Sequence, residues 1–178
     1  MLKKIVLVLA ILIAGLLIYA GVKEPAMNIS RQLSIHASSE KIFPYINNTQ
    51  KADEWMPWKD SDPTAVMNYS GPAEGVGAKS TWDSPGQMGT GQAEIIESIP
   101  NKSVKTQLTY TKPMTMAQVA EITLSPGASA DETLVTWSVN GHSTFIFRLI
   151  GIFMDCDKMV GGEFEKGLAK LKQIVEAN

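Results

Sequence analysis

The chain has 178 residues, a length that suits one domain with a short appendage. Hydrophobic residues make up 44% of the sequence and charged residues 19%, a low charged share for a soluble domain, and the first 26 residues account for much of this bias. The net charge of -2 gives no electrostatic footprint for nucleic acid, so we expect no nucleic-acid partner. The single cysteine, Cys156, excludes an internal disulfide.

The N-terminus carries the clearest physical signal. Lys3 and Lys4 precede an unbroken apolar run from Ile5 to Val22, which ends at Lys23-Glu24-Pro25. As a helix this run is about 27 Å long, close to the hydrocarbon thickness of a bilayer. Its Leu, Ile and Val residues make insertion favourable by roughly several kcal/mol. We predict an uncleaved signal anchor and linker over residues 1–26 and a folded domain over residues 27–178.

The alternative for this segment is a cleaved signal peptide. The apolar run is longer than a usual signal-peptide core, and Tyr19-Ala20-Gly21 is a poor cleavage site. A lipoprotein signal is excluded because no cysteine lies near this end. Lys3 and Lys4 favour a cytoplasmic N-terminus and a domain on the extracytoplasmic side, by a small margin because Lys23 lies beyond the run.

The next segment predicts a strand followed by a short helix. The side chains of Met27–Ala37 alternate between two faces. One face carries Ile29, Arg31, Leu33 and Ile35 and the other is polar, which is typical of a half-buried strand. Residues 39–47 carry apolar side chains at helical spacing, and Pro44 inside them predicts a short or kinked helix.

The following eighty residues have the alternation of strands separated by Gly, Pro and Asn turns. Because the linkers are short, we predict an antiparallel meander. Side chains of alternating positions are assigned to its inner face: Val104, Thr106, Leu108, Tyr110, Met116, Ala120, Ile122, Leu124, Val135, Trp137 and Val139. The six predicted strands cover Thr64–Ser70, Ala78–Asp83, Thr90–Ile99, Ser103–Thr111, Thr115–Leu124 and Thr133–Asn140.

The C-terminus changes to a helical period. Met159, Phe164, Leu168, Leu171 and Val175 recur at steps of three and four residues, which predicts an amphipathic helix over residues 158–177. Three glycines in this helix are each unfavourable by about 1 kcal/mol relative to alanine, and we expect them to permit close packing or a bend around a bulky group: Gly161, Gly162 and Gly167.

This order of elements resembles the START-like superfamily, also called SRPBCC, and within it the polyketide cyclase/dehydrase-like group. The resemblance covers the chain from Asn28 to its end. It is carried by ASSEKIFPYI (37–46), EWMPW (54–58), GPAEGVGAKSTW (71–82), GTGQAEI (89–95) and FEKGLAKLK (164–172). It implies an α+β helix-grip fold, in which a curved antiparallel sheet of about seven strands surrounds the C-terminal helix.

The resemblance also implies a cavity between the sheet and the long helix. Inward-facing strand residues would line it together with residues of the helix, and aromatic side chains with one polar atom would orient a ligand at its rim. Nine methionines suit an adaptable apolar surface. The alternative for each of these residues is ordinary core. The cavity candidates are Trp55, Trp58, Trp82, Leu108, Tyr110, Met116, Ile122, Trp137, Met159 and Phe164.

Other titratable residues give weak signals. His36 and His142 have no partner nearby in the sequence and are predicted to be exposed. No spaced ligand cluster accompanies Asp155-Cys156-Asp157, so we predict a helix cap there and no metal or cofactor. One of Glu94 and Glu121 would suit a buried acid or base, but an outward-facing charge is the simpler interpretation.

Three hypotheses for function follow. The favoured one is a membrane-anchored START-like domain that binds a hydrophobic or amphipathic, lipid-like small molecule. The second is a cyclase, dehydratase or hydrolase that uses the same pocket and needs a buried titratable residue. The third is a protein-interaction module, which requires a large exposed apolar patch and a closed interior.

Overall fold

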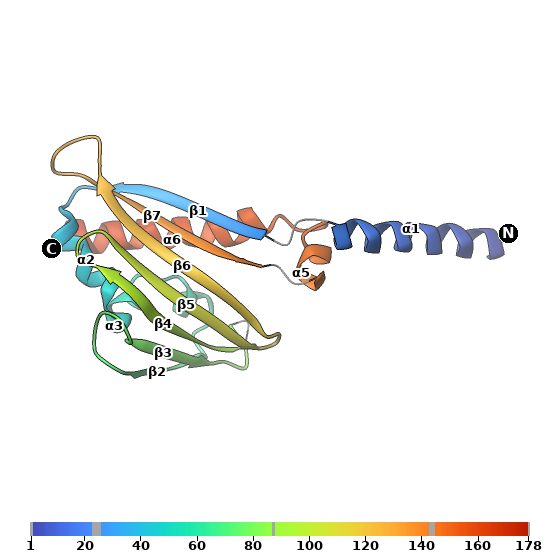
Figure 1. Ribbon diagram of the computed structural model, residues 1–178, viewed down its shortest axis with the longest axis horizontal. Coiled ribbons are helices and arrows are strands. Elements are labelled where there is room, and N and C mark those ends of the chain that lie inside the picture. Colours follow the sequence, from blue (N-terminus) through green and yellow to red (C-terminus); the bar gives the residue numbers. More distant parts are fainter. Residues whose placement is uncertain (1, 23–25, 87, 143–144, 178) are drawn as a thin grey trace.

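The computed structural model describes residues 2–22, 26–86, 88–142 and 145–177. It shows a curved sheet of seven antiparallel strands, a long C-terminal helix packed against it, and an apolar N-terminal helix that projects from one end (Figure 1). The predicted helix-grip fold is therefore confirmed. The helices are α1 (Leu2–Val22), α2 (Ser39–Asn47), α3 (Thr49–Ala52), α4 (Trp58–Ser61), α5 (Phe145–Ile150) and α6 (Cys156–Ala177). The strands are β1 (Ala26–Ile35), β2 (Val66–Ser70), β3 (Lys79–Asp83), β4 (Thr90–Ile99), β5 (Ser103–Lys112), β6 (Met116–Pro126) and β7 (Thr133–His142).

The strands follow the order β1-β7-β6-β5-β4-β3-β2, so β2 to β7 form the predicted meander and β1 closes on β7. Most strand and helix boundaries differ from the sequence prediction by one or two residues, and two of these differences have a visible cause. β2 begins at Val66 rather than Thr64, because the N–H and hydroxyl of Thr64 both bond to the Asp62 carboxylate and hold a turn. α6 begins at Cys156 rather than Lys158, because the Asp155 side chain accepts a hydrogen bond from the Lys158 N–H at 3.1 Å and caps the first turn.

The two halves of α6 have different surroundings. Leu168, Leu171 and Val175 in its C-terminal half are fully buried against the sheet and α2. Phe164 and Met159 in its N-terminal half face an open volume instead. The solid core therefore fills the end of the molecule that holds α2, and the other end is left hollow.

The N-terminal half of α6 is held by β1. The Arg31 guanidinium forms ion pairs of 2.8 Å with Asp157 and with Glu165. It lies where a side chain at Gly161 would have to be, so the glycine is required for this close approach. Gly167 serves a similar purpose beside Trp137, whereas Gly162 borders open space. The expectation of close packing therefore holds for two of the three glycines.

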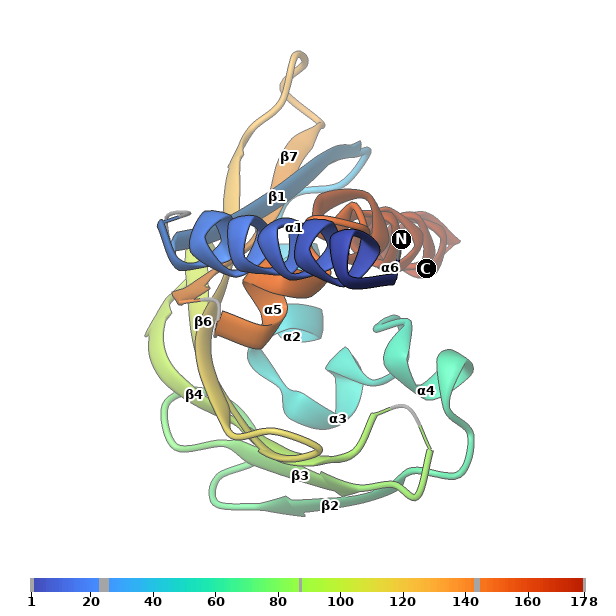
Figure 2. The same ribbon diagram turned by 90° about the vertical axis from the view of Figure 1, so that its right-hand side faces the viewer.

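Helix α1 is long and apolar enough to cross a membrane, with a mean hydropathy of 2.9 over Lys3–Val22. Its side chains are mostly exposed, but Ala20 is fully buried. The last turns of α1 lie against α5 (Figures 1 and 2). Arg148 Nη1 donates a hydrogen bond of 3.2 Å to the Gly21 carbonyl. The predicted end of the anchor at 23–25 lies outside the described residues.

Candidate functional site

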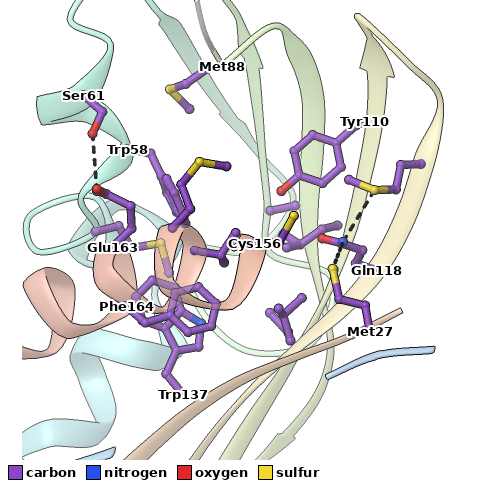
Figure 3. Close-up of a pocket in the computed structure, with 18 of the residues that line it drawn as sticks. Met27, Trp58, Ser61, Met88, Tyr110, Gln118, Trp137, Cys156, Glu163 and Phe164 are labelled. Atoms are coloured by element: carbon purple, nitrogen blue, oxygen red, sulfur yellow. Dashed lines mark hydrogen bonds between the residues drawn. The ribbon is translucent and has the colours of Figure 1, made fainter. Parts of the chain in front are cut away.

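A cavity of about 1080 Å³ lies between the sheet and the N-terminal half of α6 (Figure 3). The α3–α4 region closes one side of it, and the segment between α5 and α6 forms part of its edge. Most of its wall is apolar, and its volume lies at the upper end of the range for small-molecule sites.

The sheet wall of the cavity comes from alternate residues of adjacent strands. Antiparallel pairing sets Tyr110 of β5 opposite Met116 of β6, and Leu108 opposite Gln118. Side chains two residues apart on a strand share a face, so both strands present a row to the interior. The predicted inner faces of β5 and β6 are confirmed along the cavity. The residues in these rows are Val104, Thr106, Leu108, Tyr110, Met116, Gln118, Ala120 and Ile122.

Methionine dominates the cavity wall. Every methionine among the described residues lines it, eight in all. They come from β1, the α3–α4 region, β2, the β3–β4 turn, the β5–β6 hairpin, the α5–α6 connection and α6. An unbranched, polarizable side chain fits ligands of different shape, so such a wall suits a variable apolar molecule.

Aromatic rings form two groups in the wall. Trp137 stacks on Phe164, with ring centroids 4.1 Å apart and an angle of 11° between the planes, and Trp58 meets Trp137 edge to face at 6.3 Å. In the second group Trp82 meets Tyr110 edge to face at 5.5 Å. The Trp82 indole N–H donates to the Met88 carbonyl at 3.2 Å, which fixes the ring.

The structure brings together nine of the ten cavity candidates. Trp55 is the exception: it is fully buried, its indole N–H donates to the Tyr45 carbonyl at 2.9 Å, and its ring packs edge to face on Trp137. Trp55 therefore supports the cavity wall from behind. The nine that line the cavity are Trp58, Trp82, Leu108, Tyr110, Met116, Ile122, Trp137, Met159 and Phe164.

The sequence interpretation missed Gln118, although it lies between two residues assigned to the inner face. Gln118 is 7% exposed, and among the described residues its Nε2 has hydrogen-bond contacts only with the sulfurs of Met116 at 3.5 Å and Met27 at 4.0 Å. Sulfur is a weak acceptor. Figure 3 shows the amide oxygen of Gln118 and the hydroxyl of Tyr110 directed into the cavity. Strict alternation along β6 was the signal that could have found this residue.

A half-buried acid, Asp53, lies on the cavity wall beside the α3–α4 region. Burial raises the pKa of the Asp53 carboxyl, while a hydrogen bond from the Tyr69 hydroxyl and the nearby charge of Lys59 lower it in part. Partial desolvation, together with the bond to Asp53, raises the pKa of Tyr69. Asp53 and Tyr69 come from distant parts of the chain, so sequence spacing gave no sign of the pair.

A second carboxylate, Asp62, organises the edge of the cavity. It accepts hydrogen bonds from the Met88 N–H at 3.0 Å, the Ser84 hydroxyl at 2.7 Å and the Thr64 hydroxyl at 2.6 Å. These bonds hold the pKa of Asp62 well below its usual range, with the Met88 bond the largest cause. The network ties the turn before β2 to the turn after β3.

The remaining sequence candidates lie on the surface. His36 and His142 are exposed, and the His36 imidazole lies 2.9 Å from Asp131. Glu94 pairs with Lys79 at 2.8 Å on the outer face of the sheet. Glu121 lies 3.9 Å from Lys105 on that same face, a longer contact. Among the described residues, no three His, Cys, Asp or Glu side chains gather as a metal site.

The comparison with protein families matches residues 26–176 to the family described as polyketide cyclase/dehydrase and lipid transport. The chain belongs to this family. The match begins after α1 and covers the sheet, the cavity and α6. It supports a ligand-binding SRPBCC domain. A comparison with curated proteins finds no match.

Solved structures of similar fold support the family assignment at the level of architecture. Norcoclaurine synthase from Thalictrum flavum, solved with dopamine and hydroxybenzaldehyde, is 16% identical with a TM-score of 0.64, over 90% of this chain and 92% of that one. The Aha1 dimer from Colwellia psychrerythraea is 23% identical with a TM-score of 0.58, over 84% of this chain and 96% of that one. At these identities the likeness shows the fold alone.

Proposed function

We propose that this member of the polyketide cyclase/dehydrase and lipid transport family is a membrane-anchored domain that binds a hydrophobic or amphipathic, lipid-like small molecule. The observation that carries the proposal is the cavity of about 1080 Å³ with eight methionines in its wall. A solid core would leave no such volume, because protein interiors are close-packed. Helix α1, with its mean hydropathy of 2.9, supports the anchor.

The polar groups of the wall narrow the ligand class. The inward positions of β5 from Val104 to Tyr110 and of β6 from Met116 to Ile122 are uncharged. Lys112 lies at the end of β5, and the other charged lining residues lie on other segments of the wall. A charged group deep in this cavity would lose its hydration without a counter-charge. Tyr110 and Gln118 are diagonal neighbours on adjacent strands, with a typical Cα separation of about 7–8 Å. A single hydroxyl or carbonyl group of a ligand therefore fits between their side chains. The proposed ligand is therefore neutral, with one hydrogen-bonding group on an apolar body.

Photocrosslinking tests the proposal with a fatty alcohol that carries a diazirine in its chain and a terminal alkyne. The full-length protein in native membranes is irradiated, and the crosslinked peptides are mapped by mass spectrometry. We expect crosslinks on β5, β6 and α6 in addition to those that α1 receives from the bilayer.

Two variants on one strand provide the control. Ala120→Trp fills the cavity and should abolish crosslinking on β5 and β6 while crosslinks on α1 persist. Ala117 is exposed on the outer face of β6, so Ala117→Trp should behave as the wild type. Crosslinks confined to α1 in the wild type would contradict binding in the cavity, and their absence from α1 would contradict the anchor.

A catalytic use of the same cavity is the second candidate, and Asp53 is the observation that favours it. A carboxyl group whose pKa is raised by burial suits a general acid or base. The test follows the fatty alcohol probe, without irradiation, by mass spectrometry during incubation with the wild type and with Asp53→Asn. A change of mass that requires Asp53 would favour the enzyme, and recovery of unchanged probe would favour simple binding.

A further inference from the structure

Large apolar side chains remain exposed at one end of the domain, next to α1. Phe153 is 74% exposed and Ile146 is 51% exposed. An exposed phenylalanine leaves apolar area in water, each Å² of it unfavourable by about 25 cal/mol. We call this surface the apolar rim, and it consists of Phe145, Ile146, Ile150, Phe153 and Met154.

The apolar rim has a fixed position relative to α1. Helix α5 carries the first three of its residues and packs on the last turns of α1, where Ala20 is fully buried. Arg148 of α5 donates a hydrogen bond to the Gly21 carbonyl and lies over the Phe145 ring at 5.9 Å. Figures 1 and 2 show α5 at the point where α1 joins the domain.

This position sets the depth of the rim once α1 spans a bilayer. Gly21 lies at the end of the apolar run, where the hydrocarbon core meets the headgroups. The contact with α1 holds α5 at that same level. An apolar surface there is buried about 5–10 Å into the boundary between headgroups and acyl chains, and an arginine beside it reaches the phosphates.

The rim also borders the cavity. Phe153 and Met154 line the cavity and are nevertheless 74% and 47% exposed, so they mark an opening. Met159 of α6 lines the same opening and is 54% exposed. On the opposite side the β5–β6 hairpin contributes the exposed residues Lys112 and Pro113.

We propose that the apolar rim rests in the surface of the bilayer that anchors α1 and turns the cavity mouth toward the lipid. The partner is a lipid surface, and the ligand passes between bilayer and cavity without crossing water. This inference rests on the proposed membrane anchor. A second copy of the chain or another protein on the rim would shield the same side chains, and the experiment separates these outcomes.

Site-directed spin labelling tests the proposal on the full-length protein in phosphatidylcholine nanodiscs. Cys156→Ala removes the native thiol, and single labels are introduced by Phe153→Cys, Leu12→Cys or Val76→Cys. Collisions of each label with oxygen, which concentrates in lipid, and with a water-soluble nickel chelate are then measured. Leu12 lies in the middle of α1, and Val76 is a 60% exposed apolar residue that does not line the cavity.

We expect the labels at positions 12 and 153 to be accessible to oxygen and protected from nickel, and the label at 76 to be accessible to nickel. Nickel access at position 12 would refute the anchor itself. Nickel access at position 153 with position 12 protected would refute the membrane-seated rim and leave the anchor intact. Protection of position 153 from both reagents would also refute it, because a protein partner shields a label in that way.

A second variant keeps the test independent of position 153. Ile146 is exposed and does not line the cavity, so Ile146→Asp places a charge on the rim without changing the binding wall. We expect the label at 153 to lose its protection from nickel in this background while position 12 stays protected. Ile96→Asp, at a 45% exposed position of β4, is the matched control and should change neither label. Unchanged protection at position 153 in Ile146→Asp would overturn the proposal.

Discussion

At the scale of single residues, the Gln118 amide is the group expected to select the ligand. Within the part of the chain that the structure describes, its Nε2 has only two methionine sulfurs as acceptors, so a ligand hydroxyl would gain a hydrogen bond without breaking a strong one. Gln118→Leu keeps the volume and removes the amide. One hydrogen bond of about 0.5–1.5 kcal/mol corresponds to roughly two- to tenfold weaker binding.

Competition by unlabelled 1-dodecanol against the photoreactive fatty alcohol measures this loss. Gln92 provides the control, because it alternates with the lining residue Ala93 and faces outward on β4. We expect 1-dodecanol to compete as well in Gln92→Leu as in the wild type. Equal competition in Gln118→Leu and the wild type would show that the amide does not contact the ligand.

The Asp62 carboxylate makes the stability of the cavity edge depend on pH. Its pKa in the folded state lies well below the ordinary 3.8, because the Met88 N–H and the Ser84 and Thr64 hydroxyls donate to it. A lowered folded-state pKa contributes stability that is present above the unfolded pKa and is lost as the pH falls toward the folded value. Asp62→Asn should therefore be less stable than the wild type at pH 7, and the difference should shrink below pH 4.

Urea unfolding of both proteins in one detergent, from pH 7 to pH 3, measures this difference. Asp83 is exposed and accepts a single hydroxyl bond from Thr90, so Asp83→Asn serves as the comparison. We expect Asp83→Asn to lower the free energy of unfolding less than Asp62→Asn does at pH 7. A difference between Asp62→Asn and the wild type that stays constant with pH would contradict the assignment.

At the scale of one element, α6 contains two glycines whose substitution by alanine should change the stability of the protein in opposite directions. A Cβ at Gly162 would meet no atom within 4 Å, so Gly162→Ala should stabilise the protein by about 1 kcal/mol through helix propensity. A Cβ at Gly167 would lie 2.9 Å from the Trp137 ring and 3.1 Å from Pro57. Such overpacking is unfavourable by about 1–3 kcal/mol, so Gly167→Ala should destabilise the protein.

Thermal unfolding gives the change in Tm for each variant. The two changes can be compared directly, because both substitutions are glycine to alanine in the same helix. Opposite shifts of Tm are expected, and similar shifts would show that Trp137 yields to the added methyl group. Gly167→Ala should also perturb fluorescence from the cavity, because Trp137 stacks on Phe164 in its wall.

At the scale of the whole molecule, the architecture was predictable because its strands are half-buried. The alternation along β5 and β6 assigned Leu108 and Tyr110 to the inner face before any contact was known. The site was predictable only where its residues follow that period. The same rule failed to include Gln118, because the inner face was selected by hydrophobicity as well as by position.

Residues outside regular strands could not be placed from the sequence. Trp55 and Trp58 are three positions apart, yet one is buried behind the wall and the other lines the cavity. Their directions depend on the turn between α3 and α4 and on the Tyr45 carbonyl that holds Trp55. The Asp53–Tyr69 bond joins the end of α3 to β2, and such a tertiary contact leaves no local pattern.

The short connection between α1 and β1 limits how far the domain can travel. The described part of α1 ends at Val22 and β1 begins at Ala26, and a fully extended chain covers at most about 14 Å from one residue to the other. With α1 anchored as proposed, this tether is shorter than the bilayer is thick. The cavity would then exchange its contents only with the membrane that holds it, in cis, and a facing membrane would lie beyond its reach.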